Sequence, residues 1–345
     1  MNKVKTIILI VLACCNLNLN AQTGTWRIVD SVRSKVYQTM SLKAIDCVDT
    51  LNCAVLGNYG WTWPLITSTQ DGGNTWELNF IDSISKGDQD LYIPANEICY
   101  ADTSLCIMIC DEGYYYISRD KCKTWEKLRL GKDPLNRISF LNKDVGVINS
   151  YYNLYITRDG ARSWETISYD SLNISQNGIT EAFIFVYYLN EMALYLMLYV
   201  DDQNFIVKSE DGGKTWKFLY LFPQRVTNIE FINDSLGFAA GRIKVNTNKY
   251  KSVIYKTTDG GKTWVNKLDS LSQPYRGLKQ IYFSDKQNGV ALASGWDLWR
   301  TSDGGESWIK DTSYYTFRFN DYGADIALLG STKKFLIANE SNSFI

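Results

Sequence analysis

Carboxylates and thiols are the residues of this 345-residue sequence that could carry chemistry, because the chain contains no histidine. The absence of imidazole excludes a Ser-His-Asp triad, a Cys-His pair and every zinc site that needs a histidine ligand. Glycoside hydrolysis needs only two carboxylates, so that reaction stays open. Among the acidic residues outside the repeated turns, Asp201, Asp202, Asp297 and Asp325 are available, but nothing singles out a pair. We therefore predict no catalytic residues and no cofactor.

Six other aspartates recur in one short motif, of which Lys256 to Trp264 is the clearest copy. The motif joins Asp, glycines, a hydroxyl residue and Trp, and such glycines favour a tight turn that Asp hydrogen-bonds and Trp anchors. One carboxylate per turn makes a poor metal site, since calcium takes about six to eight oxygen ligands. We interpret the turns as structural and expect no bound metal. Their residues are Asp71 and Trp76, Asp120 and Trp125, Asp159 and Trp164, Asp211 and Trp216, Asp259 and Trp264, and Asp303 and Trp308.

The cysteines are concentrated in one part of the chain. Two of the eight, Cys14 and Cys15, lie near the start, and the others all fall between residues 47 and 122. Cys47 and Cys53 flank a short turn, and Cys99 and Cys106 flank a similar one, so each pair could form a disulfide across one hairpin in an exported protein. Two alternatives are open: several cysteines could be small buried apolar residues, or thiolates could hold a metal, although no Cys-x-x-Cys pair is present.

The repeated turn also carries a family resemblance. Tryptophans at positions 26, 76, 125, 164, 216, 264 and 308 mark a repeat of 39 to 52 residues. The pattern Ser/Thr-x-Asp-Gly-Gly-x-Thr-Trp resembles the Asp-box, or bacterial neuraminidase repeat, which in its family joins the third and outermost strands of a propeller blade. The unit around it also resembles the photosystem II stability and assembly factor family. That resemblance covers nearly the whole mature chain and implies a propeller that acts as a non-catalytic platform.

Each repeat has the same order of short strands. A strand ending in an aromatic residue or Cys, such as Ile229 to Phe231, precedes a second strand that a small residue opens, such as Gly237. Four short strands and one turn in about 45 residues have the dimensions of a propeller blade. We expect blades at 40–80, 91–130, 134–169, 176–221, 225–269 and 275–312.

The tail predicts one more blade. Strands are expected at 316–319, 324–329 and 334–338, and the strand at Trp26 would be the fourth strand of that blade. An N-terminal strand that completes the last blade removes sheet edges. The sequence therefore predicts an all-β, seven-bladed β-propeller of four-stranded antiparallel blades. The alternative is six blades, which leaves the tail and Trp26 unexplained.

The start of the chain predicts export. Lys3 and Lys5 precede an apolar run at 6–13, which is too short to span a bilayer. We expect residues 1–21 to be a signal peptide and 22–345 to be a single propeller domain. The alternative is a lipoprotein signal with lipid attached at Cys14. Either interpretation places the protein in the periplasm, outside the cell or on the outer membrane or cell surface, with membrane contact only through that anchor.

Aromatic residues mark the loops that blade geometry places opposite the aspartate turns. Exposed tyrosine and tryptophan suit sugar rings or an extended peptide, whereas the alternative is packing between blades. A net charge of −1 gives no electrostatic case for nucleic acid. The candidate binding residues are Tyr59, Trp61, Trp63, Tyr114, Tyr115, Tyr151, Tyr152 and Trp296.

These observations predict an exported, non-catalytic binding or assembly platform that recognises a protein or a glycan on its loop face. The alternative is a carbohydrate-active enzyme of the Asp-box type, a glycoside hydrolase or a sialidase-like protein. Sialidases of this type carry an Arg-Ile-Pro motif. Neither Arg27-Ile28 nor Arg137-Ile138 is followed by proline here, which favours the platform.

Overall fold

The chain folds almost entirely into short strands. The structure is a computed structural model that describes residues 6–13, 25–32, 40–59, 63–72, 74–80, 93–172, 185–200, 203–246, 249–271, 277–293, 298–311, 325–328 and 335–341. In these ranges the only helices are two 3-10 turns, η1 (Asp111–Gly113) and η2 (Tyr169–Leu172). None of the described residues forms a helix with the length and apolarity that a membrane span requires.

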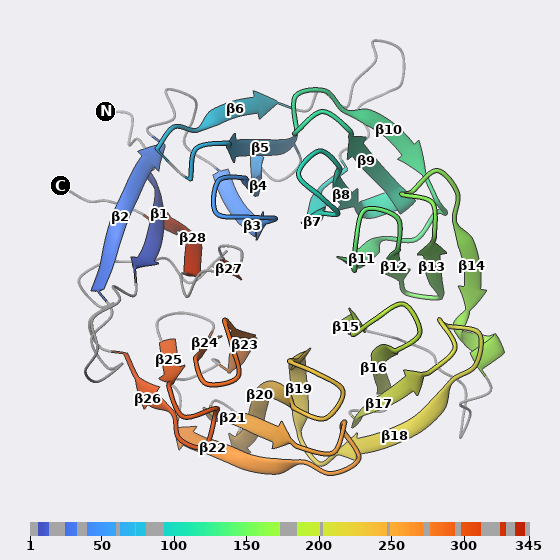
Figure 1. Cartoon of the computed structure of the whole chain (residues 1–345), viewed down its shortest axis with the longest axis vertical. Coiled ribbons are helices and arrows are strands. Elements are labelled where there is room, and N and C mark those ends of the chain that lie inside the picture. Colours follow the sequence, from blue (N-terminus) through green and yellow to red (C-terminus); the bar gives the residue numbers. More distant parts are fainter. Residues whose placement is uncertain are drawn as a thin grey trace. The chain divides into compact units, whose positions relative to one another are not determined.

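The fold is an all-β propeller of four-stranded antiparallel blades, whose strands Figure 1 labels in chain order. The chain divides into two compact units, which are described separately. The second unit, Ile109–Tyr115 with Leu128–Ile281, holds three complete blades. Their strands are β11 (Leu135–Phe140), β12 (Gly146–Ser150), β13 (Asn153–Thr157) and β14 (Glu165–Ser168); β15 (Phe185–Tyr188), β16 (Leu194–Val200), β17 (Gln203–Ser209) and β18 (Lys217–Phe222); and β19 (Arg225–Phe231), β20 (Gly237–Asn246), β21 (Lys249–Thr257) and β22 (Val265–Leu271).

The first unit consists of Met1–Met108, Tyr116–Lys127 and Tyr282–Ile345. It holds one complete blade and most residues of two others. Their strands are β3 (Met40–Cys47), β4 (Cys53–Tyr59), β5 (Trp63–Thr69) and β6 (Glu77–Phe80); β7 (Ala95–Tyr100), β8 (Cys106–Cys110), β9 (Tyr114–Ser118) and β10 (Glu126–Arg129); and β23 (Leu278–Phe283), β24 (Gly289–Ala293), β25 (Leu298–Thr301) and β26 (Ile309–Lys310).

The predicted number of seven blades is corrected to six. Within the described residues, six blades are each built from four consecutive strands, and one further four-stranded sheet takes its strands from both ends of the chain in the order β2-β1-β28-β27. In that sheet β2 (Thr25–Val32) pairs with β1 (Thr6–Ala13), and β1 pairs with β28 (Phe335–Ser341). The strand at Trp26 therefore neighbours a strand from segment 1–21 and not a tail strand, a pairing that the repeat pattern does not reveal. The expected strand at 316–319 lies outside the described residues, and removal of 1–21 stays a prediction.

Burial decreases across each blade from the second strand to the fourth. The second strands Cys106–Cys110, Gly146–Ser150 and Gly289–Ala293 are buried at every residue. The fourth strand of the second blade, Glu126–Arg129, is polar and mostly exposed. Apolar runs thus form the interior of these blades, and the charged outer strand of the second blade protects its edge from pairing with another chain.

In the aspartate turn after each third strand, both oxygens of the aspartate carboxylate accept hydrogen bonds from the turn. In the fifth blade, Asp259 Oδ1 accepts bonds from the Thr257 hydroxyl at 2.8 Å and the Thr263 amide at 2.9 Å, and Asp259 Oδ2 accepts the Thr263 hydroxyl at 2.6 Å. These bonds favour the carboxylate and lower the pKa of Asp259 to about 2, with the Thr263 hydroxyl contributing most. Gly261 follows with a φ of 90°, a value that favours glycine.

Two glycines meet one aromatic ring beside the aspartate turn of the fifth blade. In the fifth blade, a β-carbon at Gly237 would lie 2.6 Å from Phe231 Cδ1, and a β-carbon at Gly261 would lie 3.3 Å from Phe231 Cζ. We call this contact of the first-strand aromatic residue with the two glycines the strand-end junction. The ring of Phe231 also stacks on Tyr195 with centroids 4.0 Å apart. The junction therefore closes the turn end of the blade core.

Candidate functional site

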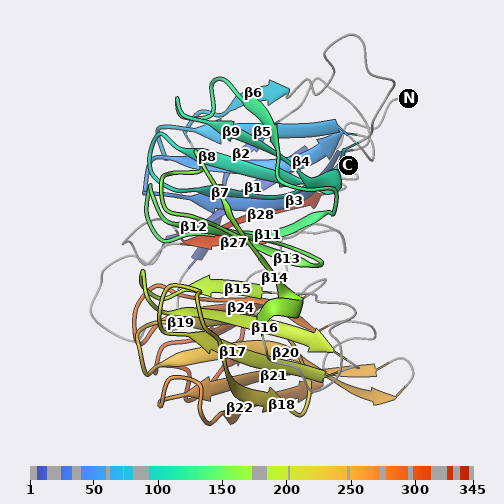
Figure 2. The ribbon, with the colours of Figure 1, turned by 90° about the vertical axis from the view of Figure 1, so that its right-hand side faces the viewer.

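Two arginines lie side by side at the end of the fifth blade that is opposite its aspartate turn. Arg225 begins β19 and is the direct cross-strand partner of Arg242 on β20. At the other end of the same strands, Phe231 pairs with Gly237, next to the turn. Figure 2 shows β19 to β22 among the strands of the second unit. Like charges in directly opposite positions destabilise a strand pair, so this placement needs another explanation.

Tyrosine rings support both guanidinium groups. The Arg225 guanidinium carbon lies 5.0 Å from the centroid of the Tyr199 ring, and that of Arg242 lies 4.7 Å from the centroid of the Tyr250 ring. A guanidinium stacked on an aromatic face is attracted by the ring and keeps its N–H groups in a plane around its edge. The rings therefore hold the arginines in place while their donors stay available.

No acidic side chain neutralises this pair. In the described part of the chain, neither Arg225 nor Arg242 has a carboxylate within ion-pair distance. The Nε atom of Arg242 is buried and has no hydrogen-bond partner among these residues. Burial, followed by repulsion from Arg225, lowers the pKa of the Arg242 guanidinium. An anion placed between the two groups would remove both costs.

The surroundings make room for the pair and add to its charge. A β-carbon at Gly277 would lie 2.4 Å from Arg242 Cβ, so only glycine at 277 leaves space for the arginine side chain. Lys244 lies two residues further along β20, on the same face of the strand as Arg242, and is exposed. Lys244 pairs across the hairpin with Tyr250. The β20–β21 hairpin is thus positively charged next to the arginines.

This arrangement suits a planar anion. Arginine donates parallel N–H bonds that match a carboxylate, and such charge-assisted bonds are about twice as strong as neutral ones. The described residues here supply cations and rings, and the cross-strand partner of Arg242 is Ser252, whose buried hydroxyl has no hydrogen-bond partner among them. The site can bind and orient an acidic group.

The aromatic residues predicted for the loop face have different environments. Tyr115 is buried and packs edge-on against Trp164 with centroids 6.1 Å apart, which is blade packing. Tyr114 is half-buried beneath Arg129, whose guanidinium carbon lies 4.6 Å from the ring centroid. Tyr151 is half-buried, and Tyr152 is 56% exposed.

The remaining aromatic candidates are only partly described. Tyr59 and Trp63 pair across the β4–β5 hairpin, which is the end of the first blade opposite its aspartate turn. Trp61 and Trp296 lie outside the described residues. None of the candidates that the structure describes contacts the arginine pair, which is supported by Tyr199 and Tyr250.

The cysteines form one disulfide. Cys47 and Cys53 are cross-strand partners on β3 and β4 and are joined, with their α-carbons 4.1 Å apart. The predicted pair Cys99 and Cys106 is not formed in the structure, and the strand geometry gives the reason for this correction. The residue of β7 that corresponds to Cys47 is Tyr100, the last residue of its strand, and Cys99 precedes it. Neighbouring residues of a strand face opposite sides of the sheet, so Cys99 is directed away from Cys106.

The repeat pattern of the sequence did not indicate the arginine pair. Its template used positions that recur in every repeat, and Arg242 occupies one that varies. The fifth residue after the opening residue of the second strand is Asn58, Asp111, Tyr151 and Arg242 in the first, second, third and fifth blades. The sequence feature that could have indicated this site is the presence, in one repeat only, of two arginines at positions that face each other on neighbouring strands.

Comparisons with known proteins agree with the fold. No family model matches the chain. The chain is homologous to the photosystem II stability/assembly factor HCF136, chloroplastic, of Cyanidioschyzon merolae, with 23% identity over 309 residues, or 81% of this chain and 67% of that protein.

Two solved structures are similar to the chain over most of their length. The structure of YCF48 from Cyanidioschyzon merolae has a TM-score of 0.62 at 17% identity and covers 92% of this chain and 97% of its own. The structure of YCF48 bound to D1 peptide has a TM-score of 0.60 at 14% identity, over 88% and 97%. At these identities the likeness establishes the β-propeller fold.

Proposed function

We propose that this protein is a non-catalytic binding platform that holds a protein partner through an acidic group at Arg225 and Arg242. The observation that carries the proposal is the pair of arginines at directly opposed strand positions, without an ion-pair partner among the described residues. A C-terminal carboxylate or an acidic side chain of an extended peptide has the charge and planarity that this pair matches. Tyr199 and Tyr250 add apolar surface beside the charge.

The relatives support a protein partner. A homologous protein is named as a stability and assembly factor, and a structure of the same fold is described as bound to D1 peptide. We extend from them the idea of a peptide ligand, and leave the identity of the partner to experiment. The assignment of the aspartate turns to the Asp-box, export through residues 1–21 and a glycan ligand belong to the proposal as expectations from the sequence.

Peptide binding tests the proposal directly. The purified full chain is offered a library of short random peptides in two forms, one with a free C-terminal carboxylate and one amidated, and affinities of the retained peptides are measured by calorimetry. We expect retained peptides to be acidic or to end in a free carboxylate. Arg225→Gln and Arg242→Gln should each weaken binding by about tenfold or more, because each removes charge-assisted hydrogen bonds.

Arg129→Gln is the matched control. Arg129 also lies over a tyrosine ring, but its Nε donates to the Glu112 carbonyl at 3.1 Å, so its guanidinium is already engaged. Its removal should leave peptide affinity unchanged. Equal retention of free and amidated peptides that lack acidic residues would contradict the proposal, and so would full affinity in both arginine variants. Retention of oligosaccharides in a parallel panel, with no peptide retained, would favour the glycan ligand.

A further inference from the structure

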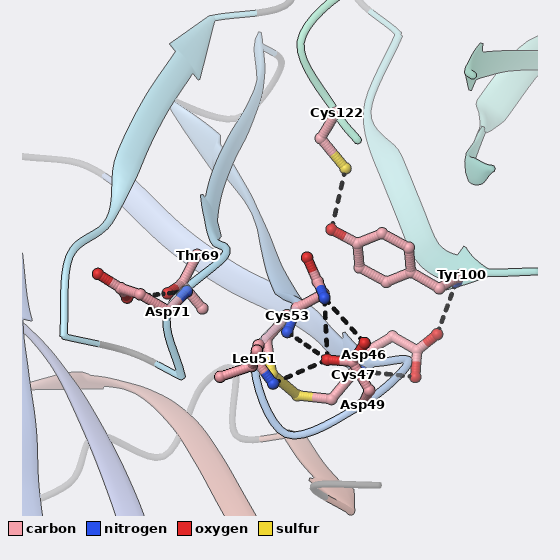
Figure 3. The surroundings of a disulfide bond; sticks show 10 residues. Asp46, Cys47, Asp49, Leu51, Cys53, Thr69, Asp71, Tyr100 and Cys122 are labelled. Carbon is pink, nitrogen blue, oxygen red and sulfur yellow. Dashed lines mark hydrogen bonds between the residues drawn. A yellow bond between two sulfur atoms is a disulfide. The ribbon is translucent and has the colours of Figure 1, made fainter. Parts of the chain in front are cut away.

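The strand-end junction of the second blade has a composition of its own. Tyr100 takes the aromatic position, and cysteine replaces both junction glycines of the fifth blade, with Cys106 at the start of β8 and Cys122 in the aspartate turn. The hydroxyl of Tyr100 lies 3.2 Å from Cys122 Sγ, and Figure 3 draws this contact. The Cys106 thiol is close enough to Cys122 for the two to raise and lower each other's pKa. Both cysteines are fully buried.

The fifth blade explains why these two side chains meet. At Gly237 and Gly261, added β-carbons would both approach the ring of Phe231, at 2.6 Å and 3.3 Å, so the two positions project towards one point. The turn of the second blade has the same local geometry, because Cys122 N–H donates to the Ser118 hydroxyl at 2.9 Å, as Gly261 N–H donates to Thr257. Cysteines at both positions therefore place their sulfur atoms next to each other.

The first blade already has a covalent junction. There the aromatic position is Cys47, the first glycine position is Cys53, and the two are joined by the disulfide that Figure 3 shows. In the second blade the aromatic position keeps its ring, and the second cysteine lies in the turn. The two blades thus differ in which pair of junction positions holds the sulfurs.

We propose that Cys106 and Cys122 are an oxidation site that forms a second structural disulfide, which links the start of β8 to the aspartate turn of the second blade. The oxidant is an external disulfide, either a small molecule such as oxidised glutathione or a protein disulfide. The inference is independent of the ligand proposed for the arginine pair.

Thiol–disulfide exchange accounts for every atom and electron. The Cys122 thiolate attacks one sulfur of the external disulfide, which forms a mixed disulfide and releases one thiolate. That thiolate takes the proton of the Cys106 thiol, and the Cys106 sulfur then attacks Cys122 Sγ. The second external thiolate leaves and is protonated by the proton that Cys122 gave up. Two cysteine thiols are oxidised, and one external disulfide is reduced to two thiols.

The environments of the two thiols fit this order of attack. Hydrogen bonding, first with Cys106 and then with Tyr100, lowers the pKa of the Cys122 thiol. Burial raises the pKa of the Cys106 thiol, so Cys106 is the slower thiol to ionise. Cys122 also lies beside the exposed turn of Asp120 and Lys123, whereas Cys106 is inside the sheet. Exchange therefore begins at Cys122 during folding or a local opening of the turn.

Peptide mapping without reduction tests the linkage. The full chain is refolded in a glutathione redox buffer, denatured, alkylated, digested and analysed by mass spectrometry. We expect two linked peptide pairs, Cys47 with Cys53 and Cys106 with Cys122, and alkylated Cys99 and Cys110. Alkylation of both Cys106 and Cys122 in the oxidised protein would overturn the proposal, and so would a bond from Cys106 to Cys99 or Cys110.

Cys122→Gly is the matched variant, because complete turns have glycine here and Cys122 has a φ of 64°, which favours glycine. The variant should fold, and its Cys106 should become alkylated after denaturation. The bond closes a loop between residues 106 and 122, so oxidised wild type should have a Tm roughly 3–6 °C above its Cys122→Gly variant. A Tm that is equal in the two proteins, together with an intact linkage in the map, would refute the structural role.

Discussion

The two ends of the fifth blade differ in how their polar groups are paired. At the turn end, Asp259 accepts three hydrogen bonds, and Phe231 packs against Tyr195 and the junction glycines. The opposite end, where the β20–β21 hairpin lies, is called the hairpin end. There Arg225 opposes Arg242, and the buried Nε of Arg242 has no hydrogen-bond partner in the described chain. One end satisfies its polar groups internally, whereas the other keeps an unneutralised charge at a cost in stability.

Along the same strands, the turn end therefore contributes stability and the hairpin end contributes ligand recognition. Residues at the turn end recur from blade to blade because each blade must close its core and its turn in the same way. Residues at the hairpin end vary, because a ligand needs them in one blade only. Buried polar groups without partners are rare in proteins and accumulate at functional sites. Three changes test the separation, from the largest expected effect to the smallest.

Phe231→Ala should cause the largest loss. Phe231 is 2% exposed and packs against Tyr195 and Trp264, so its removal leaves a cavity at the junction. We expect the free energy of unfolding to fall by about 4 kcal/mol, measured by urea denaturation. Peptide affinity of the folded fraction should stay close to wild type.

The conservative variant Phe231→Leu keeps most of the volume and should lose clearly less stability than Phe231→Ala. If Phe231→Ala weakened peptide binding in fully folded protein, the two ends of the blade would be coupled, and the separation argued above would be wrong.

Acid should destabilise the turn end. Hydrogen bonds from the threonine or serine of each turn lower the pKa to about 2 for Asp71, Asp120, Asp159, Asp259 and Asp303. Because the folded pKa lies below the unfolded value of 3.8, this contribution to stability is present above pH 4 and lost as the pH falls towards 2. The urea midpoint should therefore decrease steadily over this range.

Asp259→Asn identifies the source of the acid effect. The amide keeps one acceptor but carries no charge, so the variant should lose about 1 kcal/mol at neutral pH and show a shallower decrease of the urea midpoint between pH 4 and 2. A decrease as steep as that of wild type would mean that other carboxylates cause the acid sensitivity.

Prediction from sequence succeeded for the features that recur in every blade. The strand order, the turn and the paired Cys47 and Cys53 follow from local patterns, because a blade closes the same turn each time. The sheet that joins β1 to β28 could not be derived, since its pairing links segments more than 300 residues apart that lack the motif. Cys99 was paired wrongly because a one-residue shift in alignment moves a side chain to the other face of its strand. The arginine pair depends on a register between two variable positions, which a repeat template ignores.

Arg242→Met should cause the smallest change in stability. A small change would show that the arginine at the hairpin end serves ligand binding and not the fold. Methionine keeps much of the apolar stem of the side chain but removes a partly desolvated cation that opposes Arg225. We expect the free energy of unfolding to stay the same or to rise by up to about 1 kcal/mol, while affinity for acidic peptides falls. Arg129→Met should instead lose about 1 kcal/mol, because it removes a hydrogen bond to the Glu112 carbonyl. A loss of more than about 2 kcal/mol in Arg242→Met would show that the arginine supports the fold, and the unneutralised charge would then need no ligand to explain it.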